Sequence, residues 1–306
     1  MNDIAPIVLF AYNRPVHIQK TLDALTASPL ASESELIIFS DAPKNQQALE
    51  GVQAVRSLIK NIHGFKSVNI IEREKNFGLA NSIIDGVTSI VNQYGRAIIL
   101  EDDLVTSPFF LTYMNDGLKL YENDERVASI HSYIYPVEKK LPDYFFLRGA
   151  DCLGWATWKR SWGIFNPDSQ FLLNEIKKRN LERLFNFNDS YNYTGMLKAQ
   201  FEGKVSSWAV RWYASAFLAD KYTLYPGTSF VNHIGFDGSG TNCEDTGNYD
   251  VKFLNVYKPI PLMDVCDSIK ARRIVTEYFY SIQKMNFLKR TFRRMKKYIK
   301  RKLFKE

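Results

Sequence analysis

Long apolar runs are missing from this chain of 306 residues. No stretch approaches the roughly 20 consecutive apolar residues that a membrane-spanning helix needs. The opening segment, MNDIAPIVLF, carries an acid where a signal peptide carries bases, and its apolar run is too short for a signal's hydrophobic region. The sequence therefore predicts neither a transmembrane helix nor a secretory signal.

Cysteine and histidine are also scarce. Cys152, Cys243 and Cys266 form an odd set without CxxC spacing, which disfavours a disulfide framework or a zinc site. The four histidines are too scattered along the chain for a His-rich metal centre. Such a composition is typical of a protein in a reducing, cytoplasmic setting.

Several catalytic motifs are absent. The sequence has no GxxxxGK[ST] phosphate loop, no GxGxxG after its first predicted strand and no HExxH zinc motif. It also lacks GxSxG, which argues against a hydrolase with a nucleophile elbow. The remaining chemistry belongs to carboxylates and hydroxyls, which are ligands suited to Mg²⁺ or Mn²⁺.

Positive charge is concentrated at the C-terminal end. The net charge is +7, but residues 284–306 alone hold eleven Lys or Arg and one acid, which leaves residues 1–283 slightly negative. The basicity of the whole chain is therefore no sign that the domain binds nucleic acid. Within the tail, apolar residues recur at spacings of three and four, as on one face of a helix: Met285, Leu288, Phe292, Met295 and Ile299.

A basic amphipathic helix of this kind is typical of a segment lying on an anionic membrane, with about 1 kcal/mol for each basic residue near the lipid. We therefore expect a cytoplasmic protein that is peripherally associated with the inner face of the membrane through residues 284–306. Two alternatives stay open: the helix docks on the domain, or the tail is a polycation that attracts RNA.

The first half of the chain alternates predicted strands and helices. Strands are predicted at 5–12, 35–40, 67–73 and 96–103, and helices at 16–25, 49–60, within 74–94 and at 106–121. The last helix should have Ser107 as its N-cap and Pro108 at its first position. This order predicts an α/β fold with a mostly parallel sheet flanked by helices.

The second half has a different character. It holds all five tryptophans and short strands such as TLYPG and SFVNHIG, which indicates an α+β region. We expect one domain over residues 1–283, with a nucleotide-binding half (1–127) and an acceptor-side half (128–283), followed by the tail at 284–306.

Three consecutive acids end the fourth predicted strand. Ala97 to Leu100 are apolar on both faces, as in a strand inside a parallel sheet, and Glu101, Asp102 and Asp103 follow directly. Open α/β sheets bind ligands at this carboxyl edge. The carboxylates would raise one another's pKa unless a cation or hydrogen-bond donors compensate them. A solvated acidic loop is the simplest alternative, but a divalent cation with a diphosphate would explain the cluster.

Polar side chains follow the other three strands at the same edge. Arg14 follows the first strand, Asp41 the second, and Arg73, Lys75 and Asn76 the third. They can contact the phosphates, base or ribose of a nucleotide. Taken singly, the basic residues could be solvated loop charges and Asp41 a turn-former, but their succession at one edge favours a nucleotide-diphosphate ligand.

These segments resemble a known family. The carrying stretches are PIVLFAYNRP (6–15), IIFSDAPK (37–44), EREKNFGLANSI (72–83) and AIILEDDLVTSPFFLTYM (97–114). They resemble the GT-A-fold, nucleotide-sugar-dependent glycosyltransferases, particularly the N-acetylglucosaminyltransferase I group. CLGWATWKRSW (152–162), WAVRWYASAF (208–217) and VNHIGFDGSGTN (231–242) are similar to bacterial family-two-type enzymes that build surface polysaccharide.

The resemblance implies a role for each matched residue. Asp103 would coordinate Mn²⁺ or Mg²⁺, and Glu101 and Asp102 would hold the ribose or the donor sugar. Tyr12, Arg14, Asp41, Arg73, Lys75 and Asn76 would bind the nucleotide, with uracil as the expected base. Gly154 and Trp155 would line the pocket for donor sugar and acceptor, with the Trp155 ring against a pyranose. Trp158 and Trp162 are interpreted as core residues, and the loop GFDGSGTN would close over the diphosphate.

The catalytic base departs from the family pattern. The N-acetylglucosaminyltransferase I group carries it in a Trp-Asp-Asp-Trp segment, but here Ala209, Val210 and Arg211 stand between the tryptophans. The nearest carboxylates in matched segments are Asp237, which we favour, and Asp151. An inverting transferase needs such a group to take the proton of the acceptor hydroxyl.

The sequence thus predicts a metal-dependent glycosyltransferase that moves a sugar from a UDP-sugar to a glycan or lipid-linked glycan acceptor, without nucleic acid as a partner. The alternatives are a nucleotidyltransferase that makes sugar nucleotides, an inactive sugar-binding homologue, and a nucleic-acid-binding protein that depends on the tail.

Overall fold

The structure is a computed structural model, and it describes residues 4–235, 251 and 256–284. Asp237, most of the glycine-rich loop that contains it, and the tail beyond Lys284 lie outside the described residues.

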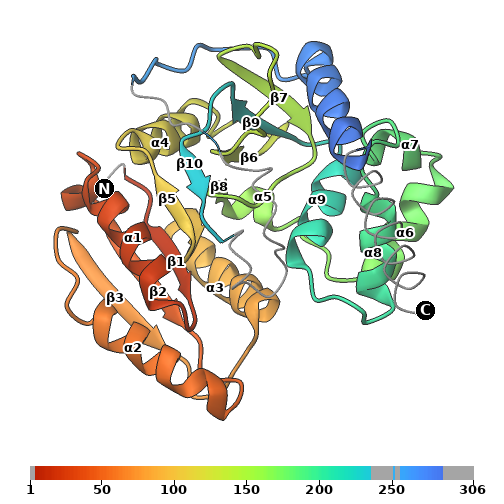
Figure 1. Ribbon diagram of the computed structural model, residues 1–306. Helices are drawn as coiled ribbons and strands as arrows, with labels where there is room; N and C mark the ends of the chain where they lie inside the picture. Colours follow the sequence, from red (N-terminus) through yellow and green to blue (C-terminus); the bar gives the residue numbers. More distant parts are fainter. Residues whose placement is uncertain (1–3, 236–250, 252–255, 285–306) are drawn as a thin grey trace, which may run out of the picture.

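One eight-stranded mixed sheet forms the centre of the protein (Figure 1). Its strands, in spatial order, are β3 (Ser67–Glu72), β2 (Glu35–Ser40), β1 (Ile7–Ala11), β4 (Arg96–Glu101), β8 (Trp155–Trp158), β6 (Val127–His131), β9 (Tyr222–Pro226) and β7 (Tyr144–Arg148). A second, two-stranded sheet pairs β5 (Leu104–Thr106) with β10 (Val231–His233) in antiparallel fashion.

Helices cover both faces of the central sheet. They are α1 (Pro15–Thr26), α2 (Leu49–Ile59), α3 (Leu79–Tyr94), α4 (Phe110–Leu120), α5 (Lys159–Trp162), α6 (Ser169–Lys178), α7 (Glu182–Phe185), α8 (Tyr193–Phe201) and α9 (Trp208–Leu218), with short 3₁₀ turns at Ala31–Glu33 and Gln46–Ala48. Residues 269–284 are also helical.

Alternating side chains of β1 divide the core between the two faces. Ile7 and Leu9 pack with α1, α2 and α4, whereas Val8 and Phe10 pack with α3 and with tryptophans of the second half. A third apolar cluster joins α6 to α9 with the helical residues 269–284, which lie beside these helices in Figure 1. No helix among the described residues is long and apolar enough to cross a membrane.

The α/β prediction is confirmed. All four strands and the intervening helices of the first half are present, and β1 to β4 are mutually parallel. The predicted cap of the fourth helix is wrong: α4 begins at Phe110, and Ser107 instead accepts a hydrogen bond from the Phe109 amide (3.1 Å) in the turn before it. The sequence also gave no sign of β5, whose three residues pair with a strand far away in the sequence.

The second half extends the same sheet. β8 pairs antiparallel with both β4 and β6, and β9 is parallel to β6. The carboxyl ends of β1 to β4, β6 and β9 therefore lie at one edge of the sheet. Open α/β sheets bind ligands at this edge. Residues that follow these strands in both halves of the chain can therefore contribute to one site.

Candidate active site

The acidic triplet lies at the carboxyl edge of the sheet, as predicted. Glu101 is the last residue of β4, and Asp102 and Asp103 form the turn that leads into β5. Residues of neighbouring elements donate hydrogen bonds to two backbone carbonyls of this turn. Thr21 of α1 donates its hydroxyl to the Asp102 carbonyl (3.0 Å), and the amide of Ile234, just after β10, donates to the Asp103 carbonyl (2.9 Å).

Arg14 compensates the charge of the triplet. Its Nη2 donates to Oδ1 of Asp102 at 2.5 Å and to Oδ2 of Asp103 at 2.7 Å. All three side chains are largely buried, with 19% of Arg14 and 6–7% of the two aspartates exposed. Arg14 also precedes Pro15 at the start of α1, so the helix start places the guanidinium over the turn.

The three acids do not all carry a charge. Burial, together with the neighbouring charges of Asp103 and Asp102, raises the pKa of Glu101 to about 8, so this side chain is mostly protonated at neutral pH. Burial also acts on Asp103, but contacts with His233 and Arg14 outweigh it and lower its pKa to about 2. The apolar strand can therefore end on three acids because Glu101 is neutral, burial raises the pKa of Asp102 as well, and both aspartates accept from the Arg14 guanidinium.

His233 is a site residue that the sequence did not single out. It belongs to β10, and its Nε2 lies 3.2 Å from Oδ2 of Asp103. Gly235, two residues after His233, also lies against Asp103. A Cβ atom at this position would be only 2.2 Å from Oδ2 of Asp103. The only sequence signal was that both residues fall in the family-like segment 231–242. The pairing of β5 with β10 brings that segment to the triplet.

Asp103 has one oxygen that suits a cation. Its Oδ1 is buried and finds no hydrogen-bond partner among the described residues. The described residues contain no group of three side chains that could hold a metal. A Mg²⁺ or Mn²⁺ ion bound together with a nucleotide needs only one or two carboxylates, because the phosphates supply further ligands. Asp103, with His233 beside it, fits this requirement.

Asp41 has a different role from the one predicted. Its carboxylate accepts four hydrogen bonds of 2.9–3.0 Å: from the amides of Ala42, Phe77 and Gly78 and from the Asn76 side chain. A carboxylate has about four acceptor positions, and Asp41 is 6% exposed, so none remains for a base or ribose. In this geometry Asp41 serves the protein's own backbone, and its direct contact with the nucleotide stays a prediction. Together with Asn76, it fixes the loop that leads into α3.

Arg73 is also engaged within the protein. Its guanidinium lies over the rings of Phe39 (5.1 Å) and Phe77 (4.3 Å) and pairs with Asp85 on α3. These contacts give Arg73 a structural role, in contrast to the predicted nucleotide contact. Lys75 is exposed in the same loop and is available to a ligand.

Tyr12 links the first loop to the triplet. Its backbone amide donates to Oδ2 of Asp102 (3.3 Å), and its hydroxyl accepts from the amide of Lys44 (3.1 Å). Its partly exposed side chain lies between the loop after β2 and the acidic turn, which is consistent with its predicted place in the site.

Trp155 belongs to the core. It is 1% exposed, and its ring lies 5.4–5.9 Å from the rings of Trp208, Trp162 and Trp212. This packing leaves no exposed ring face in the structure, and the sugar contact of Trp155 stays a prediction. Trp158 and Trp162 are core residues, as interpreted from the sequence, and are 4% and 5% exposed.

Gly154 shapes the segment that carries Asp151. It has a positive φ of 62°, and a Cβ there would lie 2.5 Å from Oγ of Ser132. Ser132 in turn donates its amide (2.9 Å) and its hydroxyl (2.7 Å) to the Gly154 carbonyl. Only glycine fits this turn, which fastens the segment before β8 to the carboxyl end of β6.

Asp151 lies at the same edge of the sheet as the triplet, because it comes shortly before β8, which runs antiparallel to β4. It accepts a hydrogen bond from the Cys152 amide (2.8 Å), and 22% of its side chain is exposed. Burial raises the pKa of the Cys152 thiol, and the charges of Asp151, Glu101 and Asp103 add to the rise. Cys152 therefore lies within the field of both Asp151 and the triplet.

Asp151 interacts electrostatically with one histidine and several tyrosine side chains. Nε2 of His131 lies 3.9 Å from its carboxylate and accepts a hydrogen bond from the Leu153 amide (3.0 Å), while burial lowers the pKa of His131 and keeps it neutral. Burial also raises the pKa of several tyrosine hydroxyls, and the charge of Asp151 adds to this rise. They belong to Tyr135, Tyr193, Tyr213 and Tyr225.

No protein-family model and no curated protein sequence matches the chain. Similar solved structures include a mannosyltransferase from Pyrobaculum calidifontis in complex with GDP-Man and Mn²⁺ (16% identity, TM-score 0.31, 44% of this chain and 39% of that one). TarS 1–349 from S. aureus has 10% identity and a TM-score of 0.39, over 74% of this chain and 59% of that one.

A third is glucosyl-3-phosphoglycerate synthase from Mycobacterium tuberculosis with Mn²⁺ and UDP (12% identity, TM-score 0.33, 58% of this chain and 67% of that one). A UDP-glucose pyrophosphorylase with UDP-glucose is similar to the same degree (12% identity, TM-score 0.33, 72% and 90%). The chain spans less than two thirds of the first two structures. At these TM-scores the likeness carries no argument about the reaction, which has to be argued from the site.

Proposed function

We propose that the protein is a metal-dependent glycosyltransferase that uses a nucleotide-diphosphate sugar, with UDP-sugar as the expected donor. The observation that carries this proposal is the arrangement of Asp103 at the carboxyl edge. It is a charged carboxylate with one buried oxygen without a partner among the described residues, and Arg14 and His233 lie beside it. Such a group holds a divalent cation and, through it, a diphosphate.

Each residue of the cluster then has a distinct task. Asp103, oriented by His233, would hold Mn²⁺ or Mg²⁺, which would stabilise the charge that develops on the departing nucleoside diphosphate. Arg14 would move part of its interaction from Asp103 to the diphosphate, because the cation takes over the compensation of Asp103. Asp102, held by Arg14 and the Tyr12 amide, would accept a hydrogen bond from the ribose or donor sugar.

Asp151 is the candidate base among the described residues. It is partly exposed, lies at the same edge of the sheet as the triplet, and its charge acts on the Cys152 thiol together with the charges of Glu101 and Asp103. A carboxylate in this place can take the proton of an acceptor hydroxyl as that oxygen attacks the anomeric carbon, which inverts the configuration. Asp237, the candidate favoured from the sequence, lies outside the described residues and remains the alternative.

The acceptor we propose is a surface glycan on a lipid carrier, reached by a protein that lies on the anionic inner face of the membrane. The support is the sequence of residues 284–306, with its ten net positive charges and apolar stripe. The tail follows the helical residues 269–284, which pack on the third apolar cluster.

A panel of nucleotide sugars tests the proposal. A ligand that binds only the native state raises the melting temperature, so UDP should raise it in the presence of Mn²⁺ and much less in EDTA. Released UDP, measured with a matching donor and acceptor, would establish transfer. Formation of UDP-sugar from UTP and a sugar 1-phosphate would instead identify a nucleotidyltransferase, and donor binding without turnover would identify an inactive homologue.

A further inference from the structure

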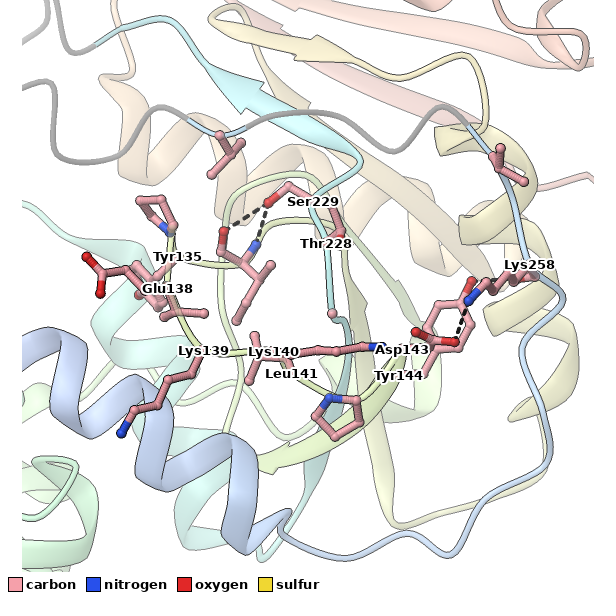
Figure 2. Close-up of a pocket in the computed structure, with 17 residues that line it drawn as sticks. Tyr135, Glu138, Lys139, Lys140, Leu141, Asp143, Tyr144, Thr228, Ser229 and Lys258 are labelled. Atoms are coloured by element: carbon pink, nitrogen blue, oxygen red, sulfur yellow. Dashed lines mark hydrogen bonds and ion pairs between the residues drawn. The ribbon is translucent and has the colours of Figure 1, made fainter.

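A cavity of about 550 Å³ lies outside the cluster around Asp103 (Figure 2). Its walls come from the loop between β6 and β7, the loop after β9 and the residues Val251, Val256 and Lys258. Its volume falls within the range of about 300–1,000 Å³ that is usual for small-molecule sites.

The cavity lies at the same edge of the sheet as the triplet. β6 and β9 run parallel to β4, so the loops that leave their carboxyl ends emerge on the same side. One short segment connects the two places: Ser229 lines the cavity, and β10, which begins two residues later, ends at His233 beside Asp103. Tyr135 also lines the cavity, and its hydroxyl lies within the field of Asp151.

The walls of the cavity are fixed by hydrogen bonds. Ser229 Oγ accepts from the Ile134 amide (2.8 Å) and donates to the Ile134 carbonyl (2.9 Å), as Figure 2 shows. The Tyr144 hydroxyl donates to the carbonyl of Lys258 (2.5 Å). A Cβ at Gly227 would lie 2.0 Å from the Pro142 carbonyl oxygen, so the two loops are packed backbone to backbone.

The lining combines apolar side chains with lysines. Pro136, Val137, Leu141, Pro142 and Val256 supply apolar surface. Lys139, Lys140 and Lys258 supply the ammonium groups. Figure 2 shows Lys140 extending toward Asp143 and Lys258, whereas Lys139 points away toward the neighbouring helix.

The ammonium groups of Lys140 and Lys258 can bind a ligand with little loss of existing interaction energy. Lys258 pairs with Asp143 (2.8 Å), but both side chains are more than half exposed, and such pairs contribute about 0–1 kcal/mol. Lys140 has no hydrogen bond or ion pair among the described residues, but its charge adds to that of Lys258 in lowering the pKa of Asp143. Two lysines beside an apolar wall therefore suit an anion that carries a hydrocarbon chain.

We propose that this cavity binds a phosphate or diphosphate ester with an apolar chain, as found at the lipid end of a lipid-linked acceptor. This identification of the ligand as the acceptor rests on the proposed function. Bound there, the ester would extend along the carboxyl edge toward Asp151 and the donor site.

Geranyl diphosphate is a suitable probe. Its binding to the full chain is measured in EDTA, so that no divalent cation can support binding at Asp103. The comparison is between the wild type and the double variant Lys140→Gln, Lys258→Gln. Loss of two ammonium groups that bind a diphosphate should weaken its binding by about tenfold or more. Lys178→Gln, at an exposed lysine of α6, is the matched control and should bind as the wild type does.

Two further comparisons separate the cavity from the donor site. The double variant should keep its response to UDP with Mn²⁺, while Asp103→Asn should lose that response and keep geranyl diphosphate binding. Pyrophosphate and geraniol should each bind more weakly than geranyl diphosphate. Equal affinity of the wild type and the double variant, or equal affinity for pyrophosphate and geranyl diphosphate, would overturn the assignment. If the wild type ignores UDP but the lysine effect is seen, the proposed function fails and the cavity assignment stands.

Discussion

Nε2 of His233 lies 3.2 Å from Oδ2 of Asp103, although the two residues belong to different halves of the chain. The contact exists because β10 pairs with β5, the short strand that starts directly after Asp103. It joins the second half of the chain to the acidic turn and gives Asp103 a second partner besides Arg14.

Asp103→Asn should leave the fold intact, because Arg14 keeps its ion pair with Asp102. The amide has no charge to hold a divalent cation, so UDP binding in the presence of Mn²⁺ should be lost. For a UDP concentration of 100 times its Kd, the wild type should gain about 2.7 kcal/mol in unfolding free energy and the variant almost none. Asp23→Asn on the exposed face of α1 is the control. A normal Mn²⁺-dependent response of Asp103→Asn would contradict the metal assignment.

His233→Gln should weaken Mn²⁺ binding in the presence of UDP by about 10–100-fold, the usual effect of removing a partner that orients a metal-binding carboxylate. Titration of Mn²⁺ by its paramagnetic resonance signal measures this directly. Unchanged Mn²⁺ affinity would mean that His233 only packs against the turn.

Asp151→Asn should lower turnover by about 10²–10⁴-fold, as expected for a positioned acid–base group, with UDP affinity nearly unchanged. Asp237→Asn is the informative comparison, since it carries the alternative assignment. Should the Asp237 variant lose turnover while the Asp151 variant keeps it, the base lies in the segment outside the described residues.

Asp41→Ala should lower the free energy of unfolding by about 1–3 kcal/mol, because partly buried amides of the loop before α3 lose their acceptor. Urea unfolding measures the change. The variant's affinity for UDP, measured at a temperature where it is fully folded, should be close to that of the wild type. A large loss of UDP affinity with unchanged stability would restore the nucleotide-binding role that the sequence suggested.

The stability of the protein in EDTA should depend on pH through Glu101. Its pKa is about 8 in the folded protein, against about 4.3 in the unfolded chain, so the folded state holds the proton more tightly. The resulting stabilisation is complete below about pH 4 and is lost as the pH rises toward 8, by at most about 1.4 kcal/mol per pH unit.

Glu101→Gln has no proton to lose, so its unfolding free energy should fall less than that of the wild type between pH 5.5 and 7.5. Urea unfolding at the two pH values provides the measurement. An equal change in unfolding free energy in the two proteins would show that Glu101 is ionised in the folded state.

The alternation of apolar strands and amphipathic helices was enough to predict the first half of the sheet. Ala97 to Leu100 are apolar at every position, which places β4 inside the sheet and Glu101 to Asp103 at its carboxyl edge. The same reasoning placed Arg14 at this edge. These features are local, since hydrophobic periodicity and the right-handed connection of parallel strands determine them.

Other assignments depended on contacts that periodicity does not encode. Asp41 reads as an exposed strand-end acid, but the returning loop at Asn76 to Gly78 occupies all of its acceptor positions. Trp155 resembles a sugar platform in its motif, but three tryptophans from α5 and α9 cover its ring. In both cases the partner is distant in sequence, so only packing could show that the side chain was already engaged.

The sequence by itself determined the fold class and the edge at which the acids lie, because both follow from short-range patterns of apolar and polar residues. The tertiary structure alone decided which acid is charged. Glu101 is neutral and Asp103 ionised because burial acts on both, while Arg14 and His233 contact only Asp103 of the two and reach it through the start of α1 and through β10.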